Sequence, residues 1–167
     1  MKEMDFKRPD IIRPPSEARC YFLPLTSGCS NNACAFCNYY GCKLQIRDPE
    51  DVKQEIMALN LFLTHGFRTP GMPFIVYAIA SEWDGKRIFL QDGDALVYPY
   101  EQLKEILEYL NKTFPELERI SCYGTAQDIL RLSVEELKAL KDLKMKIIYM
   151  GLESGDDEIL RKICKDS

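Results

Sequence analysis

The fold is decided by residues 87–151, which read RIFLQDGDALVYPYEQLKEILEYLNKTFPELERISCYGTAQDILRLSVEELKALKDLKMKIIYMG. Three short apolar runs begin 32 and 27 residues apart, at Arg87, Arg119 and Lys146. A helical pattern fills each interval: Tyr100–Phe114 has one apolar face, and the sequence SVEE from Ser133 is a capping box that opens a second helix. One strand and one helix per step is the rhythm of a parallel α/β sheet or barrel.

An earlier strand–helix unit precedes this stretch. Ala18–Leu23 (ARCYFL) is a short, mostly apolar run that predicts a buried strand. Asp48 is a candidate N-cap before Pro49, and apolar residues then recur at helical spacing to about Thr64. Phe74–Ala80 is apolar throughout, so its periodicity does not distinguish a strand from a helix. A last helix is predicted from Asp156 onward.

These elements predict an α/β core over residues 18–167, with four strands in strand–helix units. Residues 1–17 are predicted to be an extended arm, because Pro9, Pro14 and Pro15 lack amide donors and interrupt helices. The arm also carries basic residues, including Arg8 and Arg13, and is expected to be solvated.

The composition is that of an ordinary globular chain. Its 167 residues are 46% hydrophobic and 29% charged, enough for one domain with a core, which excludes general disorder. A net charge of -4 argues against a surface built to grip a nucleic-acid backbone. No apolar run approaches the roughly 20 residues of a membrane span, and the charged start does not resemble a signal peptide. Cytoplasm is therefore the predicted compartment.

Seven cysteines are the unusual feature, and three lie within the sequence GCSNNACAFC of residues 28–37. Cys29, Cys34 and Cys37 have C-x4-C-x2-C spacing, and Cys42 follows. Thiolates this close on one loop suit a single soft metal centre. The residues allow a structural zinc site that adds Cys42, a plant-type [2Fe–2S] cluster, or a [4Fe–4S] cluster held by three cysteines with one open iron. Cys20 and Cys122 are predicted to be small core residues.

The stretch Thr26–Cys37 after the first strand resembles the radical SAM superfamily, in particular a largely uncharacterised branch with a GCSxNxCxFC loop. The resemblance implies a partial (β/α) barrel in which Cys29, Cys34 and Cys37 hold a [4Fe–4S] cluster. The open iron would bind S-adenosylmethionine. One electron would then cleave it to methionine and a 5'-deoxyadenosyl radical, which removes hydrogen from a substrate.

The resemblance also implies cofactor contacts near the first two strands. Phe36 occupies the place of an aromatic residue that lies against the adenine of S-adenosylmethionine. Asp92, Gly93 and Asp94 stand where the superfamily has a glycine-glycine-glutamate motif that contacts the methionine amino group. The aspartates are a departure from the usual glutamate, and a solvated acidic turn is the alternative interpretation.

Three further contacts are implied at later strand ends. Tyr123 ends one predicted strand and would line the pocket. Glu153 and Ser154 follow the last strand, where related proteins place polar groups near the ribose and the amino-acid end; a tight turn is the alternative. All these residues follow strands, and parallel α/β folds build their sites at the carboxyl ends of strands.

The resemblance implies an external one-electron reductant of the flavodoxin or ferredoxin type and a substrate that the sequence does not identify. No membrane or nucleic-acid partner is expected, and no protein residue is assigned as catalytic. The alternative function is a non-catalytic zinc or iron–sulfur module with a structural or electron-transfer role. Because the superfamily core has six strand–helix units and this sequence has four, the chain is expected to be a C-terminally truncated core, with weak or absent turnover.

Overall fold

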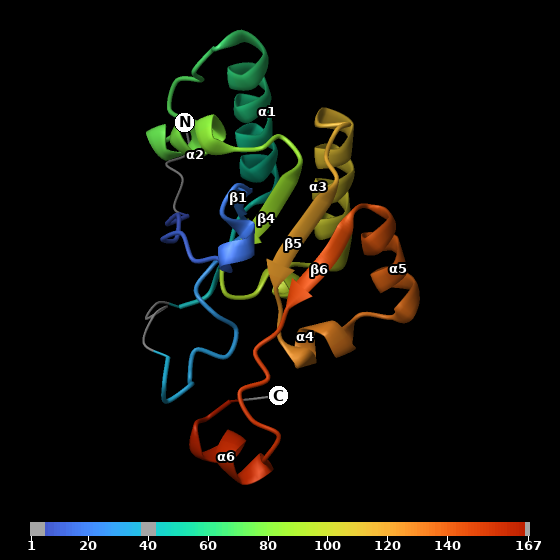
Figure 1. The fold of residues 1–167 in the computed structure, drawn as a ribbon. Helices are drawn as coiled ribbons and strands as arrows, with labels where there is room; N and C mark the ends of the chain where they lie inside the picture. Colours follow the sequence, from blue (N-terminus) through green and yellow to red (C-terminus); the bar gives the residue numbers. More distant parts are fainter. Residues whose placement is uncertain (1–5, 38–42, 166–167) are drawn as a thin grey trace.

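The computed structural model describes residues 6–37 and 43–165, and a four-stranded parallel sheet lies at its centre (Figure 1). The strands run in the spatial order β1 (Tyr21–Pro24), β4 (Arg87–Gln91), β5 (Arg119–Tyr123) and β6 (Met145–Tyr149). Neighbouring strands therefore belong to successive strand–helix units, and the sheet winds in one direction, as in a (β/α) barrel. This confirms the predicted α/β class and the partial barrel of four units.

Helices cross over between the strands. α1 (Pro49–His65), α3 (Tyr100–Thr113) and α5 (Val134–Asp142) lie side by side in chain order, with α3 in contact with both others (Figure 1). The predicted caps are confirmed: the Glu50 N–H donates to Asp48 Oδ1 at 2.8 Å, and Ser133 and Glu136 form the capping box. The helix predicted from Asp156 onward is α6 (Asp157–Lys162), which follows β6. Among the described residues no helix is long and apolar enough to cross a bilayer.

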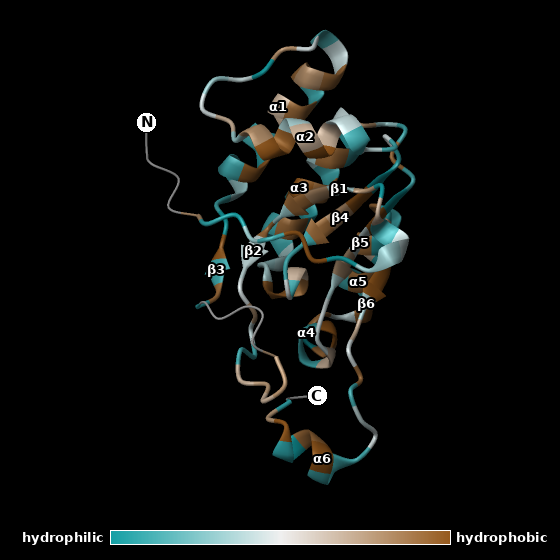
Figure 2. Cartoon of the chain, turned by 60° about the vertical axis from the view of Figure 1, so that its left-hand side comes forward, coloured by the Kyte–Doolittle hydropathy of each residue, from teal (hydrophilic) through white to brown (hydrophobic). Residues whose placement is uncertain are grey.

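The sheet has one face covered by helices and one inner face. Successive side chains in a strand alternate between the faces, and register partners in parallel strands share a face. Leu23 and Leu90 are partners on the helix-covered face, and Cys122, the register partner of Leu90, shares it, fully buried. Cys20 and Cys122 are both buried, as predicted. Figure 2 shows the strands as the apolar centre of the molecule.

The inner face carries an aromatic cluster, made of Phe22, Phe89, Tyr123 and Tyr149. The ring of Phe89 lies 5.2 Å from that of Tyr123 and 6.3 Å from that of Tyr149, centroid to centroid. Phe22 contacts Phe89 edge-on, at 6.5 Å. Aromatic edge-to-face contacts at these distances stabilise packing beyond the area they bury. The cluster therefore fixes the inner faces of all four strands relative to one another.

The undecided segment Phe74–Ala80 forms the helix α2 (Phe74–Glu82), whose buried residues contact α1 and β1. Several small elements were not predicted. They are the antiparallel pair β2 (Thr26–Ser27) and β3 (Gln45–Ile46), the helix α4 (Ala126–Arg131), and the 3-10 turns η1 (Pro15–Glu17) and η2 (Ala95–Val97). The pair β2–β3 joins the two ends of the segment that contains the cysteine loop.

The prediction of a solvated arm is wrong for Arg8 and Arg13. Arg8 donates to both carboxylate oxygens of Glu55 at 2.9 Å and to the carbonyl oxygen of Phe22 at 2.8 Å. The guanidinium of Arg13 lies 5.7 Å from the centre of the Phe22 ring. The reason is physical: β1 is an edge strand, so its Phe22 carbonyl takes the Arg8 guanidinium as a donor, while Arg13 packs on the Phe22 ring.

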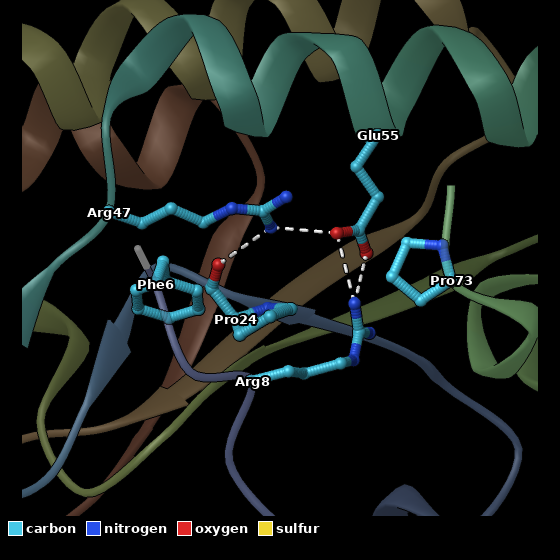
Figure 3. Close-up of a pocket in the computed structure, with 6 residues that line it drawn as sticks. All are labelled: Phe6, Arg8, Pro24, Arg47, Glu55 and Pro73. Atoms are coloured by element: carbon cyan, nitrogen blue, oxygen red, sulfur yellow. Dashed lines mark hydrogen bonds and ion pairs between the residues drawn. The ribbon is translucent and has the colours of Figure 1, made fainter. Parts of the chain in front are cut away.

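Glu55 is the centre of a buried ionic network at the β1 edge (Figure 3). Its side chain is 1% exposed and lies between the guanidinium groups of Arg8 and Arg47, with Arg47 at 2.7 Å. Tyr21 also donates to it, at 2.6 Å. Burial alone would raise the pKa of Glu55, but the two cations hold it below its usual value. A small pocket beside the network is lined by Phe6, Arg8, Pro24, Arg47, Glu55 and Pro73.

Candidate cofactor site at the carboxyl ends of the strands

The loops that follow β1, β4, β5 and β6 all leave the sheet at the carboxyl ends of the strands, at the lower side of Figure 1. The cysteine loop follows β1 and β2, and the segment Asp92–Asp94 follows β4 directly. Tyr123 ends β5, and residues 150–156 connect β6 to α6. The topology thus places every predicted site segment at the same end of the sheet, beyond the carboxyl ends of the strands.

All three predicted ligand thiols are free. Cys29 and Cys34 are half-buried and Cys37 is exposed. The side-chain amide of Asn31 donates to Cys34 Sγ at 3.1 Å, and the Cys37 N–H donates to the Cys34 carbonyl at 3.1 Å. Cys42, the fourth thiol of the zinc alternative, lies outside the described residues.

The donor set fits an iron–sulfur cluster by its chemistry. Three unpaired thiols on one loop, one of them receiving an amide N–H bond, are typical of cluster ligation. In the described part of the chain, no three Cys, His, Asp or Glu side chains converge at metal-binding spacing. The ligand assignment to Cys29, Cys34 and Cys37 therefore stays a prediction.

Two aspartates after β4 bind the residues on either side of Cys29. The Gly28 N–H donates to Asp92 Oδ2 at 2.7 Å, and the Ser30 hydroxyl donates to Asp94 Oδ2 at 3.0 Å. Asp92 and Asp94 are 1% and 0% exposed, so the solvated acidic turn that the sequence allowed is wrong. Gly28 has φ of 94°, a conformation that favours glycine. The cysteine loop is thus held against the end of β4.

Asp92 keeps one oxygen available. Its Oδ1 is buried and has no hydrogen-bond partner within residues 6–37 and 43–165. Burial raises the pKa of Asp92 to about 6, although the Gly28 and Gly93 amides oppose this. Such an oxygen is the acceptor that a bound ammonium or amide donor would satisfy.

Asp94 is fully occupied. Its Oδ1 accepts the Leu96 N–H at 3.0 Å, and its side chain is also hydrogen-bonded to that of Asp128 in α4. Burial and this second carboxyl raise the pKa of Asp94 to about 7. Burial also acts to raise the pKa of Asp128, but bonds from Asp94 and Thr125 and the Arg131 charge outweigh it, so that pKa is lowered. The pKa values of the two carboxyl groups are therefore shifted in opposite directions, and Asp94 is the one that keeps its proton to higher pH.

The remaining predicted contact residues have their own separate surroundings. Phe36 is 54% exposed on the cysteine loop, and half-buried Tyr123 packs against Phe89 and Tyr149. Glu153 has φ of 59° and lies 3.5 Å from Lys165, and the Ser154 hydroxyl accepts the Asp156 N–H at 3.1 Å. The partners given for Glu153 and Ser154, Lys165 and Asp156, lie on their own segment of the chain, so their place at the predicted site stays a prediction.

The chain just after α6 returns to the cysteine loop. The Ala35 N–H donates to the Ile163 carbonyl at 2.8 Å, and the Asn31 amide donates to the Cys164 carbonyl at 3.1 Å. Asn31 therefore bridges Cys34 Sγ and this later segment. Asn31, Ser30 and Asp128 were not predicted as residues of the site. Only Asp128 had a sequence signal, since it is the fourth residue of a T-x-x-D pattern typical of a helix start.

Comparison with known proteins identifies the family. The family model of the radical SAM superfamily matches residues 23–167. The heme chaperone HemW of Bacillus subtilis is 24% identical over 130 residues, which are 78% of this chain. A protein of Methanocaldococcus jannaschii named for methylthiotransferase activity, MJ0865, is 24% identical over 162 residues, 93% of this chain.

These matches cover 31% of the length of each relative, and no solved structure matches the chain significantly. The family match nevertheless spans nearly the whole chain, from β1 to the end of α6. It covers the cysteine loop, the Asp92–Asp94 segment and all four strand ends. The chain belongs to the radical SAM superfamily.

Proposed function

We propose that Cys29, Cys34 and Cys37 hold a [4Fe–4S] cluster with one open iron, and that the chain binds S-adenosylmethionine there. The observation that supports this best is a pair of hydrogen bonds from the two neighbours of Cys29 to Asp92 and Asp94, the ends of the DGD segment (Asp92–Asp94). A loop held in this way presents free thiols at the carboxyl ends of the strands, where parallel α/β folds build their sites.

The residues around the loop have separate proposed roles. Asp92 Oδ1 would accept a hydrogen bond from the methionine amino group of the cofactor, since this oxygen is buried and has no partner among the described residues. Gly93, which has no side chain, would let the cofactor approach the backbone, and Asp94 would hold the same segment through its bonds with Ser30 and Leu96. Phe36, exposed on the loop, would cover the adenine ring.

The later strand ends would complete the pocket. Tyr123 would close its side through the aromatic cluster, and Glu153 and Ser154 would reach the ribose and the amino-acid end. Their present partners, Lys165 and the Asp156 amide, would have to be exchanged on binding. Of the proposed contacts, these two require the largest rearrangement.

When bound, the cluster would supply the electron that cleaves S-adenosylmethionine to methionine and a 5'-deoxyadenosyl radical. The chain's own residues orient the cofactor and exclude water from its surroundings. An external reductant of the flavodoxin or ferredoxin type would provide the electron, and an unidentified substrate would lose the hydrogen. Both partners are part of the proposal.

The test is anaerobic reconstitution with iron and sulfide, followed by metal analysis. We expect about four irons per chain in the wild type, and strong loss in Cys29→Ala, Cys34→Ala or Cys37→Ala. Cys164→Ala is the matched control, because this exposed thiol is outside the proposed ligand set. The reconstituted protein is then given dithionite and S-adenosylmethionine, and 5'-deoxyadenosine is measured.

Stoichiometric zinc without iron uptake would contradict the proposal and favour a structural metal module. Equal iron uptake by the Cys34→Ala and Cys164→Ala variants would contradict the ligand assignment.

A further inference from the structure

Both chain neighbours of Cys29 are hydrogen-bonded to one short segment, Asp92–Asp94, which directly follows β4. Its preceding residue, Gly28, donates a backbone N–H to Asp92, and its following residue, Ser30, donates a hydroxyl to Asp94. The two acceptors are separated only by Gly93. Beside Cys34, the Ala35 N–H donates instead to a backbone carbonyl, that of Ile163, at 2.8 Å.

Both bonds end on buried acceptors. The side chains of Asp92 and Asp94 have at most 1% exposure, and a hydrogen bond in such a low-dielectric environment is stronger than one in water. The Gly28–Asp92 bond, at 2.7 Å, also stabilises the positive φ of Gly28. Freedom of the chain on either side of Cys29 is therefore restricted before any ligand binds.

Asp94 is itself anchored by the ends of two further elements. The Leu96 N–H donates to Asp94 Oδ1, and Asp128 in α4 contacts its side chain. Arg131 pairs with Asp128 at 3.0 Å and donates to the Leu96 carbonyl at 2.8 Å. Ser30 is thus connected through Asp94 to the ends of both β4 and β5.

We propose that Asp92 and Asp94 are positioning residues for Cys29: they fix the first cysteine of the loop relative to the sheet and so set how firmly the cluster is retained. This inference rests on the proposed function. It assigns to the DGD segment a role toward a cluster ligand, separate from any contact with S-adenosylmethionine. Preorganised ligands retain a metal centre better than ligands on a free loop, and the bonds that hold the ligands contribute to that retention.

The test measures iron release from reconstituted protein to a chelator in the absence of S-adenosylmethionine. The variants are Ser30→Ala, Asp94→Ala, their combination, and Ser30→Thr. Ser81→Ala is the matched control, because its hydroxyl also donates a hydrogen bond, at 2.9 Å to the Tyr77 carbonyl in α2. Thermal unfolding of each cluster-free protein confirms that it folds.

Ser30→Ala and Asp94→Ala are expected to release iron about fivefold faster than the wild type. The combination should again be about fivefold faster, since both changes remove the same bond. Ser30→Thr should restore slow release by keeping the hydroxyl. The electron paramagnetic resonance spectrum of the reduced cluster should broaden in Ser30→Ala, as Cys29 samples more conformations, and keep its wild-type linewidth in Ser81→Ala.

A second pair of variants, Asp92→Asn and Asp92→Ala, separates the hydrogen bond that Asp92 accepts from its negative charge. Asp92→Asn keeps an oxygen that accepts the Gly28 N–H, so its release should be slower than that of Asp92→Ala. Release from Ser30→Ala at the Ser81→Ala rate, or effects that multiply to about 25-fold in the combination, would overturn the inference while leaving the proposed function intact. A wild-type protein that takes up no iron would overturn the proposed function first.

Discussion

Asp94 and Asp128 are joined by a hydrogen bond between their carboxyl groups, at the carboxyl ends of β4 and β5. Asp94 is completely buried and Asp128 nearly so. Two carboxyl groups in contact cannot both ionise at low cost, so the pair keeps one proton to higher pH than isolated aspartates do.

The raised pKa of Asp94 makes the stability of the cluster-free protein depend on pH. The folded-state pKa of Asp94 is raised to about 7, whereas an aspartate in the unfolded chain titrates near 3.9. The folded state therefore binds more protons between about pH 4 and 7, and this contribution to the free energy of unfolding is lost as pH rises through 7. Asp128→Asn removes the second carboxyl, so its stability should fall less over this range.

Urea unfolding of the reduced, cluster-free chain at several pH values between 5 and 7.5 measures the effect. Asp142→Asn, at an exposed position that ends α5, is the control and should run parallel to the wild type. An Asp128→Asn difference that is constant across this range would show that the carboxyl pair does not hold the proton.

Glu55 should be the most sensitive carboxylate for folding. Glu55→Gln leaves Arg8 and Arg47 without their shared anion, and breaking a buried ion pair costs about 3–5 kcal/mol of the free energy of unfolding. The pKa of Glu55 is lowered, so its contribution is present above about pH 4.5 and is lost as pH falls through the folded-state value. Urea unfolding at pH 7 and pH 4 should show the cost shrinking at the lower pH.

Glu105→Gln is the matched change, because it also removes a carboxylate from an ion pair, with Lys53 at 2.6 Å, but on an exposed surface. It should leave the midpoint of unfolding almost unchanged. Equal effects of the two substitutions would mean that the network at the β1 edge is not a determinant of stability.

Gly124 should tolerate no side chain. A Cβ atom there would lie 2.8 Å from Leu96 Cδ1 and 3.0 Å from Ile148 Cγ2, between η2 and β6. Gly124→Ala should therefore destabilise the fold by about 1–3 kcal/mol through overpacking. Gly155→Ala is the control, since nothing lies within 4 Å of its added Cβ. Thermal unfolding should give a lower midpoint for Gly124→Ala alone; similar midpoints would contradict the close packing.

The sequence predicted the elements whose signals are local. Asp48 and the SVEE segment cap helices through their own neighbours, and each buried strand is a short apolar run, so their positions followed from the pattern. The apolar segment Phe74–Ala80 stayed undecided because both of its interpretations bury the same residues. α4 was missed because six residues give too few turns for a periodic pattern.

Long-range contacts explain most of what the sequence did not predict. Arg8 and Glu55 are 47 residues apart, and Asp92 and Gly28 are 64 apart, so neither bond has a local signal. The family resemblance indicated the DGD segment as a cofactor contact, but its bonds to the cysteine loop became visible only when β1 and β4 were seen as neighbours. The same holds for the basic arm, because Arg8 pairs with Glu55 in α1 and donates to a carbonyl of β1, and the sequence does not show that β1 is an edge strand.

The central claim is that three cysteines hold a cluster with one iron open to S-adenosylmethionine. Electron paramagnetic resonance of the dithionite-reduced, reconstituted protein tests it most directly, with spectra recorded before and after S-adenosylmethionine is added. A reduced [4Fe–4S] signal whose g-values shift on addition, and which is lost in Cys34→Ala, is the predicted result. A spectrum that S-adenosylmethionine leaves unchanged, or a signal retained in Cys34→Ala, would contradict the account.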